Sequence, residues 1–195
     1  MSKSVIPFTA KLVKFDTDVP FAEVISRLNT AVNKEGCGDI IARLKSTNTQ
    51  DELATVVNDA IGDSDFLYVQ FSTFVIFEPI LFNSWSTQRY FMEFKFHRLL
   101  AKHTDGVRGP STLVYTVGNP LIAQKIMKNN VFAAYNIPPR LLIVEKPDVG
   151  TTVSYYLPSS IMGQPEGAED PNLHANLQDL DIKLEILVKR ITKTS

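Results

Sequence analysis

Three histidines, His97, His103 and His174, are the side chains of this sequence best suited to general acid–base chemistry near neutral pH. Glu93, Lys95 and His97 alternate along a stretch with strand-like periodicity, which places all three on one face. The Glu93 carboxylate and the His97 imidazole would then lie about 13 Å apart, too far for a direct pair. We therefore interpret this face as a solvated polar surface. Since no histidine falls in an HExxH motif or in a Cys/His cluster with zinc spacing, the sequence predicts no metal site.

The single cysteine, Cys37, lies between Gly36 and Gly38. One thiol excludes an internal disulfide and fits a reducing compartment. A reactive thiol near a helix start is one interpretation, but a lone cysteine is more often a small packing residue, and we favour packing. Residues 1–8 carry no apolar run long enough for a signal peptide, so we expect a cytoplasmic protein.

Gly118, Asn119 and Pro120 form a turn that could present free amides to an anion at the start of a helix. The turn matches neither the phosphate-binding loop of nucleotide hydrolases nor the glycine pattern of dinucleotide-binding folds, and Pro120 removes one amide. Asn119 is instead a good N-cap and Pro120 suits the first helical position. We interpret the turn as a strand-to-helix connection.

Composition narrows the classes of function. At 195 residues the chain fits a single domain, 1–195, large enough to bury about 70% of the surface of its unfolded chain. A formal net charge of −1 gives no general attraction to nucleic acid, so we expect none as a partner. The most apolar window, Phe66–Phe82, is interrupted by polar residues and is shorter than the roughly 20 residues that span a bilayer. We expect it to be core, and no membrane as a partner.

Hydrophobic periodicity predicts a mixed arrangement of strands and helices. Strands are expected at Leu113–Val117, Leu141–Glu145 and Thr151–Tyr156, the last two joined as a hairpin, with a short helix that begins at Pro120. Asn129 and Asn130 tolerate the left-handed conformation of a C-terminal cap and should end that helix. Two further strands are expected, at Asp65–Phe77 and Tyr90–His97.

The N-terminal part predicts one strand followed by a helical excursion. The strand should span Phe8–Phe15, and Asp18 should cap a helix with an apolar face from Phe21 to Val32. A second short helix follows around Ile40. Thr49 and Glu52 have the spacing of a capping box for a third helix that stops at Gly62. We place the sheet and short helices in residues 8–162.

A glycine- and proline-rich linker, 163–171, precedes a long C-terminal helix, 172–192. Its leucines recur at spacings of four and three, which predicts one buried stripe on the sheet. Ile182, Ile186 and Val188 lie off that stripe and widen the apolar surface. The stripe residues are Leu173, Leu177, Leu180, Leu184, Leu187 and Ile191.

Three runs, Gly118–Ala123, Pro138–Glu145 and Tyr155–Ser160, together resemble a known family. They are similar to the family called domain of unknown function 302, mainly over residues 91–160. The resemblance implies a TATA-binding-protein-like α+β fold, in which a curved, mostly antiparallel sheet is gripped by a long helix. It implies no activity, so the hypothesis on function depends on the residues themselves.

The aromatic residues supply that hypothesis, because the chain has 12 Phe, 6 Tyr and 1 Trp, and more than half of them lie between Phe66 and Phe96. A sheet crossed by a long helix often leaves a cavity lined by apolar side chains with a few polar groups. We therefore expect a noncatalytic binding module, without a cofactor, for a small, largely apolar molecule between the sheet and the C-terminal helix. The candidate ligand-binding residues, chosen as polar-tipped or capping side chains near the sheet, are Tyr68, Trp85, Tyr90, His97, Tyr115, Asn119 and Tyr155.

Two alternatives come from other classes. One is an isomerase or hydrolase with His97 or His103 as general base, which requires that imidazole to face a cleft. The other is a structural homodimer without a ligand, formed through Ile182 and Ile186.

Overall fold

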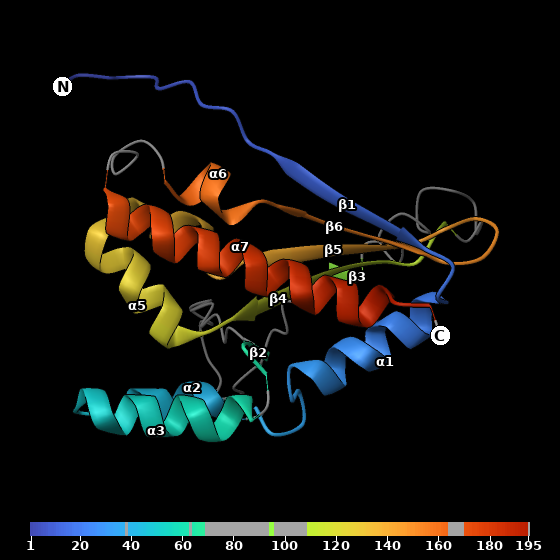
Figure 1. Ribbon diagram of the computed structural model, residues 1–195, viewed down its shortest axis with the longest axis horizontal. Coiled ribbons are helices and arrows are strands. Elements are labelled where there is room, and N and C mark those ends of the chain that lie inside the picture. Colours follow the sequence, from blue (N-terminus) through green and yellow to red (C-terminus); the bar gives the residue numbers. More distant parts are fainter. Residues whose placement is uncertain (38, 63, 69–93, 96–108, 164–169, 195) are drawn as a thin grey trace, which may run out of the picture.

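The computed structural model describes residues 1–37, 39–62, 64–68, 94–95, 109–163 and 170–194. These residues form strands and helices in the α+β class, as predicted (Figure 1). The strands are β1 Leu12–Thr17, β2 Leu67–Tyr68, β3 Phe94–Lys95, β4 Thr112–Gly118, β5 Arg140–Glu145 and β6 Thr151–Tyr156. The helices are α1 Phe21–Ala31, α2 Ile40–Lys45, α3 Gln50–Ile61, α5 Pro120–Asn129, the 3-10 helix η1 Val131–Asn136, α6 Pro158–Met162 and α7 Pro171–Thr192.

The strands lie in the order β1-β6-β5-β4, and β2 and β3 both pair with the outer side of β4. Every pairing among the described strands is antiparallel. The hairpin β5–β6 has the expected bounds within a residue. The predicted strands Asp65–Phe77 and Tyr90–His97 fall mostly outside the described residues, which include only β2 and β3 from them.

One face of the sheet carries the core. Alternate residues of β4, β5 and β6 point to this face, where Tyr115, Leu141, Ile143 and Val153 are almost fully buried. In Figure 1, α7 runs across this face, and α1 and α5 lie along its lower side in that view. Covering an apolar sheet face with helices is the layer arrangement that the period-two pattern requires.

Helix α7 confirms the predicted stripe, since its six leucine and isoleucine positions are all buried. It begins at Pro171, where the Asp170 carboxylate accepts hydrogen bonds from the amides of Asn172 and Leu173. Val188, predicted to lie off the stripe, is also buried. Ile182 and Ile186 are exposed, at 59% and 55%. Of the predicted linker, residues 164–169 lie outside the described part of the chain.

The helical excursion after the first strand is confirmed as α1, α2 and α3. At α3 the Thr49 hydroxyl accepts from the Glu52 amide and the Glu52 carboxylate accepts from the Thr49 amide, which is the predicted capping box. The predicted cap of α1 by Asp18 is wrong. Pro20 occupies the N-cap position without a side-chain bond, and the Asp18 carboxylate lies 3.7 Å from Lys146 Nζ instead.

Helix α5 ends at Asn129 with Asn130 as its C-cap, as predicted, but Asn130 is not left-handed, and the first strand also begins later than predicted. Asn130 has an extended backbone, φ −145°, because its side chain accepts from the Phe132 amide to start η1 and donates to the Met162 carbonyl. The first strand begins at Leu12 rather than Phe8. Its partner strand β6 ends at Tyr156, and Pro158 then starts α6. The residues before Leu12 therefore have no continuation of β6 to pair with as a strand.

Within the part of the chain that the structure describes, no helix combines the length and apolarity needed to cross a membrane.

Gly150 closes the β5–β6 hairpin with φ +113°, a conformation that side-chain-bearing residues rarely adopt. A Cβ added there would overlap the backbone oxygen of Thr17. The Gly150→Ala substitution should therefore lower the free energy of unfolding by at least about 2 kcal/mol, measured by urea denaturation followed by circular dichroism.

The matched control is Gly109→Ala, where an added Cβ meets no described atom within 4 Å. We expect that variant to change the free energy of unfolding by less than about 1 kcal/mol. Equal losses in the two variants would contradict the explanation from backbone strain and overlap.

Candidate functional site

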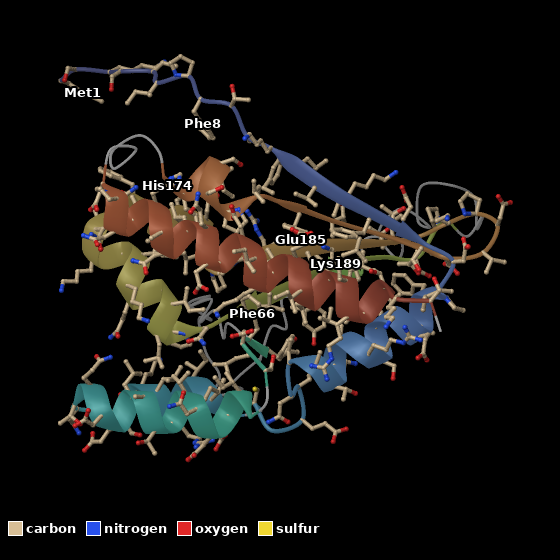
Figure 2. All side chains as sticks on the ribbon, viewed as in Figure 1. Met1, Phe8, Phe66, His174, Glu185 and Lys189 are labelled. Atoms are coloured by element: carbon tan, nitrogen blue, oxygen red, sulfur yellow. The ribbon has the colours of Figure 1, made fainter. Side chains whose placement is uncertain are left out.

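A pocket of about 320 Å³ opens at the end of β4, where the chain turns into α5. Its floor is formed by buried side chains, among them Phe66, Ile126 and Leu180. Figure 2 labels Phe66 between α7 and the α2–α3 pair. The full lining among the described residues is Ile40, Ile41, Leu44, Phe66, Leu67, Gly118, Asn119, Pro120, Ile122, Ala123, Ile126, Met127, Ala134, Ile137, Pro138, Pro139 and Leu180.

Elements far apart in the sequence bring these residues together. Helix α2 contributes one wall, and the first two turns of α5 contribute the opposite wall. The chain between η1 and β5, which contains the cis peptide bond Ile137-Pro138, forms a third side. Gln50 Nε2 of α3 donates to Gln124 Oε1 of α5 at 3.0 Å and ties the helical excursion to that wall.

Asn119 is the one polar side chain among the described lining residues, and its polar atoms are already engaged. Its Oδ1 accepts from the Leu121 amide at 2.9 Å, which confirms the predicted N-cap. Its Nδ2 donates to the Asp65 carbonyl at 3.0 Å. None of the lining residues that the structure describes is charged. The pocket therefore offers burial of apolar surface rather than an ion pair or acid–base chemistry.

Of the predicted site residues that the structure describes, only Asn119 lines this pocket. Trp85, Tyr90 and His97 lie outside the described residues, as does His103, so catalysis by either histidine stays a prediction. The expected cavity between the sheet and the C-terminal helix stays a prediction; the pocket described here lies at the end of β4, where α7 contributes Leu180 to the lining.

Tyr68 and Tyr115 form a neighbouring cluster in the core. Their rings meet edge to face with centroids 5.1 Å apart, and Lys34 Nζ lies 4.9 Å and 5.5 Å from the two ring centroids. The Tyr115 hydroxyl donates to Asn29 Oδ1 at 2.9 Å. These contacts tie the end of α1 to β2 and β4, which is a structural role.

Tyr155 lies beneath α7 and is 3% exposed. Burial, together with the nearby carboxylates of Glu185 and Asp181, raises the pKa of its hydroxyl to about 12. Burial also raises the pKa of Asp181, although its Oδ1 accepts from the Ser159 amide at 2.9 Å. Tyr155 thus belongs to the contact between β6 and α7.

The remaining candidates for chemistry have structural surroundings. Cys37 is buried, burial raises the pKa of its thiol, and its Sγ lies 3.7 Å from the Val32 carbonyl oxygen. His174 lies on the exposed side of α7 with its Nε2 2.8 Å from Gln178 Nε2. No group of three His, Cys, Asp or Glu side chains that could hold a metal ion occurs among the described residues.

Sequence reasoning missed the apolar lining of α2 and α5. Ile40, Ile41, Ile122 and Ile126 have the spacing of ordinary core-facing helix residues, so nothing in the pattern separates a pocket wall from a packed interface. The feature of the sequence that could have pointed to this end of the sheet is the Gly118–Pro120 turn, because it fixes where α5 begins.

The raised pKa of Tyr155 predicts a loss of stability at alkaline pH. The unfolded chain releases this proton near pH 10, whereas the folded protein holds it up to about 12. The associated stabilisation is complete below pH 10 and is lost as the pH rises through 12. Between these limits the wild type should lose on the order of 2 kcal/mol more unfolding free energy than Tyr155→Phe, measured by urea denaturation. Parallel pH profiles for the two proteins would contradict this.

Comparisons with known proteins agree with this fold. The crystal structure of an uncharacterized conserved DUF302 protein from Bacillus stearothermophilus superposes with a TM-score of 0.55, covering 92% of this chain and 97% of that one. The two sequences are 15% identical, so the likeness concerns the fold alone. No curated protein matches the chain. The family described as Domain of unknown function DUF302 matches residues 89–191, just over half of the chain, and the chain therefore belongs to the DUF302 family.

Proposed function

We propose that this protein is a noncatalytic binding module that holds a small, neutral, apolar molecule in the pocket between α2 and α5. The observation that carries the proposal is the apolar lining of a 320 Å³ pocket in which the only polar side chain among the described residues is already hydrogen-bonded. Its volume is at the lower end of the range for small-molecule sites, about 300–1,000 Å³.

Access to the pocket follows from the burial of its lining. Ile41, Leu44, Ala123 and Met127 are partly exposed and form the mouth, while Phe66, Leu67, Ile126 and Leu180 are buried and form the floor. A ligand entering between α2 and α5 would first contact the partly exposed apolar side chains of the mouth and then the buried apolar side chains of the floor. Such a site binds by removing apolar surface from water, at about 25 cal/mol per Å² before the cost of association.

The charge of the ligand follows from what the lining lacks. A buried ion without a partner costs several kcal/mol, and no side chain of the described lining offers a charged partner. We therefore expect the site to prefer a neutral molecule over an anionic analogue with the same apolar body.

The neutral fluorescent probe N-phenyl-1-naphthylamine tests the proposal. It should gain fluorescence with the wild-type protein, and its sulfonated analogue, 8-anilino-1-naphthalenesulfonate, should bind at least about tenfold more weakly. Ala123→Leu places a larger side chain at the mouth and should weaken binding of the neutral probe by about tenfold or more.

The matched control makes the same change at an exposed position of α1, Ala22→Leu. It should leave probe binding unchanged, since α1 contributes no residue to the described pocket lining. Equal affinity of wild type and Ala123→Leu, with both variants folded, would place the probe elsewhere and refute the proposed site.

A further inference from the structure

Strand β1 is an edge of the sheet, with β6 on one side and no described strand on the other. Lys11 directs its backbone toward β6, since its carbonyl accepts from the Leu157 amide at 2.8 Å. Because successive residues of a strand direct their backbone groups to opposite sides, Leu12, Lys14 and Asp16 present their N–H and C=O groups to the free edge. The described part of β1 contains no proline or bulge to block pairing.

The exposed side chains of this edge carry opposite charges two residues apart. Lys14 and Asp16 are 57% and 50% exposed and lie on the same face of the sheet, with Lys14 Nζ 3.0 Å from Asp16 Oδ2. The Thr152 hydroxyl donates to Asp16 Oδ1 and holds that carboxylate in place. A Lys-x-Asp edge strand is complementary to an antiparallel copy of itself, because each lysine can lie opposite an aspartate.

We propose that β1 pairs with β1 of a second copy of this chain about a two-fold axis at Phe15. In this register Lys14 lies opposite the partner's Asp16, and Asp16 lies opposite the partner's Lys14. These are the residues whose backbone groups face the free edge, so each pair exchanges two N–H···O=C bonds. The two sheets become one continuous sheet, and the interface is the same patch on both copies.

The N-terminal segment carries exposed apolar side chains next to this edge. Residues 1–11 leave β1 and project beyond the sheet, as the positions of Met1 and Phe8 in Figure 2 show. Val5, Ile6 and Phe8 on this segment are exposed at 78%, 55% and 54%. In the antiparallel pairing this segment continues past the end of the partner's β1, where it adds apolar area to a short strand contact.

The other exposed apolar site, Ile182 and Ile186 on α7, lies inside a helix, whose backbone groups are hydrogen-bonded to one another and so offer none to a partner strand. Beside these residues the Glu185 carboxylate lies 2.5 Å from Lys189 Nζ of the same helix (Figure 2). That face provides a control surface for the same measurement.

Sedimentation equilibrium over a range of protein concentrations tests the pairing. A contact of one short strand is smaller than a standard interface, so we expect a dimer of micromolar or weaker affinity for the wild type. Lys14→Asp and Asp16→Lys each place like charges opposite each other in two pairs, and each should raise the dissociation constant roughly 30-fold. Circular dichroism of each variant reports whether the monomer remains folded.

Mixing the two variants separates contact between chains from effects within a chain. In a mixed dimer the aspartate introduced at position 14 of one chain lies opposite the lysine introduced at position 16 of the other. The natural Asp16 of the first chain then lies opposite the natural Lys14 of the second, so an equimolar mixture should recover the wild-type affinity.

The α7 surface serves as the control, and the Ile182→Glu/Ile186→Glu variant should dimerise as the wild type does. A wild type that stays monomeric to millimolar concentration, a mixture that stays as weak as the separate variants, or a dimer lost only in the α7 variant would each overturn the proposal.

Discussion

The burial of the α7 stripe on one face of the antiparallel sheet is the interaction on which the rest of the structure depends. Each fully buried leucine or isoleucine contributes about 1.5–3 kcal/mol, and the six stripe residues run almost the full length of the helix. The helix is also tied at its carboxyl end, where Thr17 Oγ1 donates to the Thr192 carbonyl at 2.8 Å. One face of the sheet is thereby buried from solvent, and the edge strand β1 is held in register against the core.

The candidate pocket occurs where this cover ends. Leu180 is the only described residue of α7 that lines it, and the remaining walls come mainly from α2, α5 and the chain that leads into β5. Short helices enclose space less completely than one long helix with a continuous stripe, because each brings only one or two turns of apolar side chains to the contact. The same α+β framework therefore provides a packed centre and an open end.

Local signals in the sequence predicted well where the partner atoms are also local. The Asn119 cap and the Thr49–Glu52 capping box join residues two or three apart, and both are present. Asp18 has an equally good local signal, but its carboxylate lies 3.7 Å from Lys146 Nζ, which is distant in sequence. A cap prediction is wrong when a tertiary contact takes the same side chain.

The sequence by itself determined the α+β class, the hairpin β5–β6 and the buried stripe of α7, because hydrophobic periodicity is a property of neighbouring residues. Only the tertiary structure decided where a pocket lies, since Ile40, Phe66, Ile122 and Leu180 meet there from separate parts of the chain. Asn119 lines the pocket because the cap at the end of β4 also lies there, whereas Tyr155 is buried beneath α7, away from the described lining. The periodicity of a chain specifies which face is apolar, and the packing of elements in space decides whether that face is filled or open.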